Sequence, residues 1–150
     1  MLVDLENVLF GSHETLLDAA IDTHSDVILA TAQARRTSDQ LIVGCNPRLA
    51  FAARSAFPTA QLVTRTGANG ADAALIDHLD AAHAAGRFTE LCIVSGDHAF
   101  ASLARDARHS GLLVRVVAPS FGLSTALRLQ ADVAVTLPSI MVAMATDLAA

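Results

Sequence analysis

The sequence predicts an α/β fold, a doubly wound parallel sheet of about five to six strands flanked by helices. Short apolar runs alternate with longer helix-like stretches along the chain, and this alternation is typical of parallel sheets with right-handed crossovers. Runs such as Leu-Ile-Val, Cys-Ile-Val and Val-Arg-Val-Val are continuous rather than alternating in polarity, as expected for strands that are covered on both faces. Pro47, Pro58, Pro119 and Pro138 fall between the runs, where proline does least harm.

The elements follow from these runs in chain order. We expect strands over residues 2–5, 41–45, 61–65, 91–95, 113–118 and 133–137. Helices are expected over 14–35, 48–56, 72–85, 100–109 and 123–130, with a further helix over 139–148. Gly86 and Gly111 end two of these helices, and the polar triplet 23–25 is suited to cap a second helix that would split the first stretch. No linker or repeat interrupts the pattern, so residues 1–150 are expected to form one domain.

The amino-acid composition excludes several reaction mechanisms and kinds of site. All ten basic residues are arginine, which excludes mechanisms that need a lysine amine, such as Schiff-base formation and the P-loop. The net charge of −5 gives no overall field that attracts nucleic acid. Cys45 and Cys92 lie in apolar runs without a CxxC pattern and are expected to be small buried hydrophobes. No signal peptide or membrane-spanning run is visible, which predicts a soluble, cytoplasmic protein.

Three aspartates are expected at one edge of the sheet. Asp4 lies near the carboxyl end of the first strand, Asp97 follows the fourth, and Asp72 begins the helix after the glycine loop that follows the third strand. Parallel α/β sheets bind ligands outside the carboxyl ends of their strands, so the three carboxylates should converge there. Carboxylates that lie close together repel unless a proton or a cation joins them, and oxygen ligands suit Mg²⁺ or Mn²⁺. Each single aspartate has a structural alternative, since Asp72 and Asp97 are both placed to cap a helix.

Four segments resemble the NYN domain family of the PIN-like nuclease superfamily. Residues 3–8 (Val-Asp-Leu-Glu-Asn-Val) are similar to the opening Asp-x-x-Asn motif, and residues 70–77 to a Gly-x-Asp helix start with a later aspartate. Residues 93–100 resemble a Ser-Gly-Asp-x-Asp-Phe turn, and residues 127–132 a Leu-x-x-x-Ala-Asp lead into the last strand. The resemblance implies a PIN-like sheet and a metal-dependent ribonuclease-type site that leaves a 5′-phosphate.

The resemblance also assigns residues. It implies Asp4, Asp72 and Asp97 as acidic ligands of Mg²⁺ or Mn²⁺, and Asn7 as a residue that holds the first loop or contacts the substrate. One departure stands out, because the second acid of the Ser-Gly-Asp-x-Asp-Phe turn is Ala99 here. The adjacent His98 is either a substitute ligand or proton carrier, or an uninvolved exposed histidine.

Substrate contacts are expected from arginines beside this edge. Arg48 begins the helix after the second strand and Arg65 ends the third; each is either a phosphate ligand or an ordinary surface arginine. Asp77 is not expected to share a metal with Asp72, because five helical residues turn it away. Asp132 either anchors the last loop or lines the acidic edge. The six phenylalanines are expected mainly in the core, although base stacking by Phe10 is an option.

The leading expectation is a metal-dependent ribonuclease that hydrolyses phosphodiester bonds of RNA, with single-stranded RNA as substrate. The alternative is a degenerate domain that binds nucleic acid or a partner protein without cleaving, which Ala99 and the negative charge favour. The tail, residues 139–146, is apolar almost all round. A helix of this kind favours a homodimer slightly over packing back on its own sheet.

Overall fold

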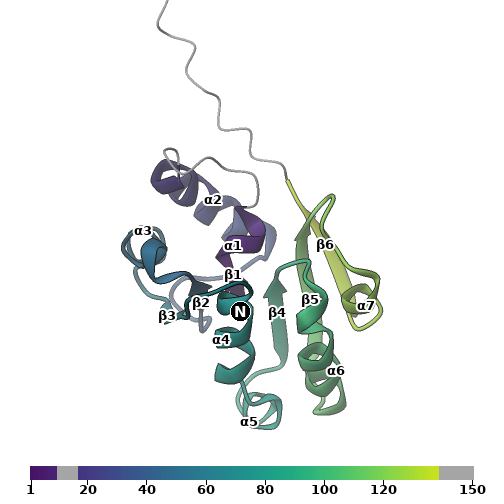
Figure 1. Cartoon of the computed structure of the whole chain (residues 1–150). Coiled ribbons are helices and arrows are strands. Elements are labelled where there is room, and N and C mark those ends of the chain that lie inside the picture. The colour runs from purple at the N-terminus through teal and green to yellow at the C-terminus, as the bar shows by residue number, and fades with distance from the viewer. Residues whose placement is uncertain (10–16, 139–150) are drawn as a thin grey trace, which may run out of the picture.

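The computed structural model describes residues 1–9 and 17–138 and contains one sheet of six parallel strands (Figure 1). Their order is β3-β2-β1-β4-β5-β6, and every neighbouring pair is parallel. The α/β class that the sequence predicts is therefore confirmed. The strands are β1 (Leu2–Asp4), β2 (Ile42–Cys45), β3 (Gln61–Thr64), β4 (Glu90–Val94), β5 (Leu113–Pro119) and β6 (Val133–Leu137).

Helices connect the strands on both faces of the sheet. They are α1 (Leu5–Val8), α2 (Leu17–Thr31), α3 (Ala50–Ala56), α4 (Gly70–His78), α5 (Ala81–Ala85), α6 (Ala101–His109) and α7 (Thr125–Arg128). Two 3₁₀ turns, η2 (Pro47–Leu49) and η3 (His98–Phe100), lead into α3 and α6. No helix of the described ranges 1–9 and 17–138 is long and apolar enough to cross a membrane.

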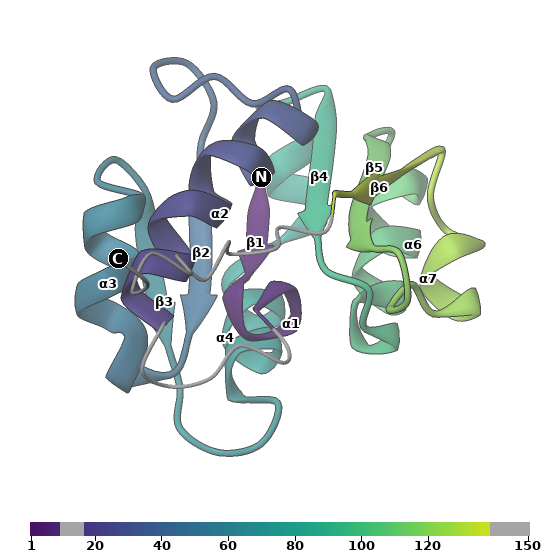
Figure 2. The ribbon, with the colours of Figure 1, turned by 90° about the horizontal axis from the view of Figure 1, so that it is seen from above.

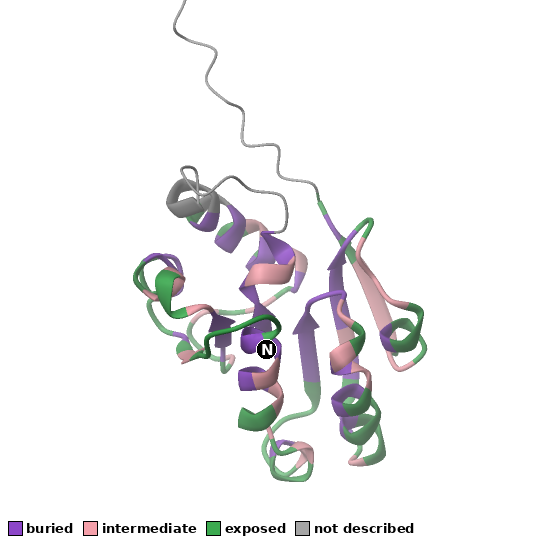
Figure 3. Ribbon diagram, viewed as in Figure 1, coloured by how far each residue is buried: buried purple, intermediate pink, exposed green. Residues whose placement is uncertain are grey.

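The core forms two layers, one on each face of the sheet. Alternate strand residues point to opposite faces, so Val3, Val43 and Val94 pack with α1, α2 and α3, whereas Leu2 and Ile93 pack with α4 to α7. Figure 2 shows α2 and α3 on one side of the strands and α4 on the other. Strands β1 and β4 are mostly buried, whereas β6 at the edge is partly exposed (Figure 3). Burial raises the pKa of the Cys45 thiol to about 11 and that of Cys92 to about 12.

Several local expectations were wrong. The expected helix 72–85 is two helices, because Leu79 leaves the helical conformation and Asp80 caps α5 through the N–H of His83. The expected break at 23–25 is absent, because the Ser25 hydroxyl donates to the carbonyl of Asp22 within a continuous α2. The expected helix 123–130 shortens to α7. The proposed dimer helix and Phe10 lie outside the described residues.

The strand order places a switch at the centre of the sheet. The chain moves outward from β1 to β2 and β3, and then returns to the other side of β1 with β4, β5 and β6. Connections on the two sides therefore diverge at the carboxyl ends of β1 and β4, where sheets of this order bind ligands. Asp4 is the last residue of β1, and Ser95 directly follows β4.

Candidate active site

Asp4 is fixed in place by the register of the central strands. It pairs with Gly44 of β2, and the β1–β4 register, which matches Leu2 with Ile93 and Val3 with Val94, places Ser95 next to it. Because Asp4 has the same strand parity as Leu2, its side chain faces the α4 side of the sheet. There the carboxylate is buried, with 4% of the residue exposed.

Asp72 reaches the same point because α4 packs tightly against β2. A Cβ on Gly44 would lie 2.6 Å from Leu75 Cγ and 2.9 Å from the carbonyl oxygen of Ala71. Only glycine at position 44 therefore lets the first turn of α4 rest on the strand beside Asp4. Asp72 lies in that turn and is buried. Asn69 occupies the N-cap position, so the alternative that Asp72 caps the helix was wrong.

A hydrogen-bonded chain joins the end of β1 and helix α1 to the loop after β4. The Ser95 hydroxyl donates to Asp4 Oδ2 at 3.0 Å and accepts from the Asp97 amide at 3.1 Å. Asn7 accepts the N–H of Gly96 at its Oδ1, at 2.9 Å, while its own backbone amide donates to Asp4 Oδ1 at 3.4 Å. Helix α1 and the loop after β4 are thus held together at the carboxylate of Asp4.

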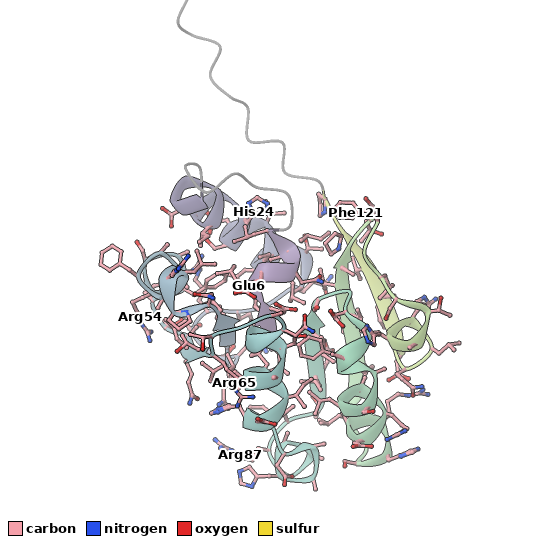
Figure 4. All side chains as sticks on the ribbon, in the orientation of Figure 1. Glu6, His24, Arg54, Arg65, Arg87 and Phe121 are labelled. Carbon is pink, nitrogen blue, oxygen red and sulfur yellow. The ribbon has the colours of Figure 1, made fainter. Side chains whose placement is uncertain are left out.

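The electrostatics of Asp4 set it apart from the other described carboxylates. Its pKa is raised to about 7, chiefly because burial penalises the charged form. The hydrogen bonds from Ser95 and from the Asn7 amide oppose this rise, and the negative charges of Asp72 and Glu6 add to it. Figure 4 shows Glu6 near the centre of the molecule. A divalent cation here would remove both the burial penalty and the repulsion between Asp4 and Asp72.

Comparisons with known proteins identify the family and support the fold. A sequence model of the NYN domain matches residues 1–138. The chain belongs to the NYN domain family. Members of this family are generally ribonuclease-like nuclease domains that use divalent metal ions. A crystal structure of a protein of unknown function from Vibrio parahaemolyticus has the same fold, with a TM-score of 0.60, 21% identity and coverage of 92% of this chain and 91% of that one. The search of curated proteins gave no match.

Asp97 is held differently from Asp4 and Asp72 in this NYN domain. Its Oδ1 accepts the N–H of Ala99 at 2.8 Å and so caps η3, as the structural alternative expected. The Nδ1 atom of His98 lies 3.1 Å from the same oxygen, and the imidazole is exposed. Within residues 1–9 and 17–138, no three His, Cys, Asp or Glu side chains gather as ligands for one ion. Asp72 is close enough to Asp4 for its charge to raise the pKa of Asp4, and the assignment of all three aspartates to one metal site stays a prediction.

The pair Asp4 and Asp72 fits a magnesium-type ion. Mg²⁺ keeps several waters and is commonly held by one or two carboxylates together with substrate phosphate. The oxygen-only donors and the raised pKa of Asp4 agree with a site that gains from a bound cation.

The remaining predicted residues divide between the two ends of the sheet. Arg65 pairs with Asp77 at 2.8 Å, on the exposed side of α4. Arg48 is exposed, and its guanidinium has no ion-pair partner in the described part of the chain. Asp132 anchors the last loop, since its carboxylate accepts the N–H of Val114 at 2.8 Å and lies 3.3 Å from Arg108. Asp132 therefore lies at the amino end of the strands, whereas Asp4 lies at their carboxyl end. The alternative that Asp132 lines the acidic edge was wrong.

Sequence reasoning missed Gly44, Ser95 and Gly96 as positioning residues. Gly96 is needed because a Cβ there would collide with the carbonyl of Gly122 in the loop after β5. The sequence shows the Ser-Gly-Asp segment, but only its aspartate has a residue type that predicts a metal ligand. The residues next to Gly44 in the sequence do not indicate its role, because it lies inside an apolar strand. Glycine is required there because helix α4 packs where a Cβ would lie.

A pocket of about 470 Å³ opens at the other end of the strands, lined by the start of β4 and the segments before β2 and β4. Two of its arginines are neutralised, Arg35 by Asp39 and Arg115 by Glu90. It is separate from the carboxylates of the NYN site.

Proposed function

We propose that this NYN domain is a ribonuclease that uses Mg²⁺ or Mn²⁺ to hydrolyse phosphodiester bonds of single-stranded RNA. The observation that carries the proposal is the pair of buried carboxylates, Asp4 and Asp72, at the carboxyl end of β1. Two buried acids side by side destabilise a fold that has no use for them. Membership of a ribonuclease-like family supplies the reaction class.

Asp4 and Asp72 would hold the ion. The chemistry that a divalent cation held by them would supply is activation of water for attack on phosphorus and neutralisation of charge on the leaving oxygen. The Ser95 hydroxyl orients Asp4 by donating to Oδ2, which leaves Oδ1 beside the weaker 3.4 Å contact with the Asn7 amide. Asn7 in turn holds the loop after β4 through Gly96. These contacts fix the carboxylate before substrate arrives, so little reorganisation is needed.

Asp97, His98 and the arginines act around this pair. We assign Asp97 to the same site as an outer acid, with its amide tied to Ser95. The exposed imidazole of His98 is placed to give or take a proton at the solvent side. Arg48 is available to bind a phosphate. Arg65 can exchange its exposed partner Asp77 for a phosphate, because surface ion pairs contribute little.

The test is cleavage of a 5′-labelled single-stranded RNA pool with Mn²⁺, Mg²⁺ or EDTA. The wild type should cut with either ion and leave 5′-phosphate ends, whereas EDTA and the variants Asp4→Asn and Asp72→Asn should abolish cutting. Glu90→Gln, at the opposite end of the sheet, is a matched removal of one acid and should keep full activity. Cleavage that survives in Asp4→Asn contradicts the proposal.

A second candidate function is binding of RNA without cleavage. Two observations favour it: Ala99 stands where the resembled turn has an acid, and the Asp97 carboxylate is engaged in capping η3. RNA binding by a wild type that cuts with neither ion would select this candidate.

A further inference from the structure

Some of the phenylalanine rings are largely exposed to solvent. Phe57 and Phe100 are fully buried, as expected of core phenylalanines, but Phe51 is 87% exposed and Phe121 is 73% exposed. Phe88 is also exposed, at 38%, so among the five described phenylalanines the expectation that they lie mainly in the core was wrong. Isolated apolar side chains on a surface are ordinary, so the question is where Phe51 and Phe121 lie.

Phe121 lies at the carboxyl-end edge of the sheet. It comes two residues after Pro119, the last residue of β5. The next residue, Gly122, packs against Gly96, and the N–H of Ser124 donates to the carbonyl of Gly96 at 2.9 Å. The loop that carries Phe121 is thus attached directly to the loop that Asn7 and Ser95 tie to Asp4. In Figure 4 Phe121 lies at the upper end of the molecule and Arg87 at the lower end.

Phe51 flanks the same edge on the other side. It lies in the first turn of α3, which follows β2 through η2. Ala52, Ala53 and Ala56 carry the buried face of α3 and leave Phe51 on the solvent face. Arg48 precedes Phe51 by three residues and has no ion-pair partner among the described residues. In the strand order, β1 with Asp4 lies between β2, which leads to Phe51, and β5, which leads to Phe121. Because α3 covers the face of the sheet opposite to the Asp4 side chain, a path from Phe51 to Asp4 passes over the carboxyl ends of the strands.

We propose that a single RNA strand crosses the carboxyl-end edge from η2 and α3 to the loop after β5, with bases stacked on Phe51 and Phe121 on either side of Asp4. This inference rests on the proposed function and specifies how its substrate is held. An acidic protein without lysine cannot rely on a basic groove, whereas stacking holds bases independently of charge. Arg48 then supplies a local phosphate contact beside Phe51.

Stacking of bases on these two rings also requires the RNA substrate to be single-stranded. Bases within a duplex already stack on one another and offer no free face, while unpaired bases do. Each base stacked on an aromatic side chain is expected to contribute about tenfold in affinity. Phe51 and Phe121 are positioning residues in this scheme, and their loss should weaken binding rather than change the chemistry.

The test uses the absence of tryptophan and tyrosine from the chain. Phe51→Trp and Phe121→Trp each create a single fluorescent reporter at an exposed position that accepts the larger ring. Phe88→Trp is the matched control, because Phe88 is 38% exposed and lies under the guanidinium of Arg87 at the opposite end. Binding is measured in EDTA, with a single-stranded RNA of about 12 nucleotides and with its duplex.

We expect the single strand to quench the tryptophan of Phe51→Trp and of Phe121→Trp but not that of Phe88→Trp, and the duplex to quench none. Phe51→Ala and Phe121→Ala should each raise Kd, and KM where cleavage is measured, by about tenfold with kcat unchanged. Equal quenching at position 88, equal quenching by the duplex, or no quenching at 51 and 121 overturns the path. Quenching without cleavage would support the RNA path and contradict the ribonuclease proposal. Cleavage without quenching would support the ribonuclease proposal and contradict the path.

Discussion

Replacing Asp4 by asparagine tests the burial of its charge. In the folded protein the pKa of Asp4 is about 7, against about 3.9 in an unfolded chain. Below about pH 4 the group is protonated in both states and contributes no pH dependence. As the pH rises towards 7 the unfolded state ionises first, so folding loses about 1.4 kcal/mol per pH unit, and the loss is complete above about pH 7. The asparagine side chain in Asp4→Asn cannot ionise and avoids this loss.

The expected change in the free energy of unfolding comes from the roughly two pH units between 5 and 7, because above about pH 7 Asp4 is ionised in both states. Relative to wild type, Asp4→Asn should gain about 3 kcal/mol in free energy of unfolding between about pH 5 and pH 8, in EDTA. Any constant offset from the altered hydrogen bonds to Ser95 and Asn7 cancels from this difference. Urea unfolding at the two pH values measures it. Asp39→Asn is the control, because hydrogen bonding from the Arg35 amide lowers the pKa of Asp39, so both states are already ionised and its difference should stay flat.

Added metal should offset most of this relative advantage of Asp4→Asn. With Mn²⁺ at about a hundred times its Kd, the wild type at pH 8 should gain about 2.7 kcal/mol, whereas Asp4→Asn should gain much less. A stability difference between Asp4→Asn and wild type that is the same at pH 5 and pH 8 would refute the reasoning, because Asp4 would then be an ordinary ionised surface acid.

Three further predictions concern the residues around Asp4. Ser95→Ala removes a hydrogen bond to the carboxylate and should raise the pKa of Asp4 further, so the pH midpoint of Mn²⁺ binding, measured by calorimetry, should shift upward; an unchanged midpoint would show that Ser95 does not act through Asp4. Gly44→Ala should cost about 1–3 kcal/mol in thermal unfolding and weaken Mn²⁺ binding, since α4 must move, whereas Gly86→Ala, whose Cβ meets only ordinary contacts, should do neither. Ala99→Asp adds a carboxylate two residues after Asp97 and should increase Mn²⁺ affinity or the rate of RNA cleavage; if neither changes while Asp97→Asn abolishes both, another group completes the site and His98 is the candidate.

The strand skeleton could be predicted because burial on both faces leaves a local mark. Residues 91–94 are apolar without a break, and residues 113–118 are apolar apart from Arg115. The observed strands lie within one residue of the expected ones. Asp4 was expected near the carboxyl end of a strand over residues 2–5, and it is the last residue of β1.

Contacts between distant segments could not be predicted in this way. The meeting of Asp4 and Asp72 depends on Gly44, whose role is set by the approach of α4 rather than by its strand neighbours. Arg65 pairs with Asp77 because β3 and α4 bring them together across the chain. The exposure of Phe51 depends on which face of α3 packs against α2, and three small alanines gave the sequence no strong apolar stripe.

The most direct test of the account is a single comparison of RNA cleavage at pH 8. Wild type and Asp72→Asn are incubated with labelled single-stranded RNA in Mn²⁺, and loss of full-length RNA is followed with time. The account predicts metal-dependent cleavage by the wild type and none by Asp72→Asn, although both bind the RNA and both are folded. Equal cleavage by the two proteins, or cleavage by the wild type that persists in EDTA, would contradict it.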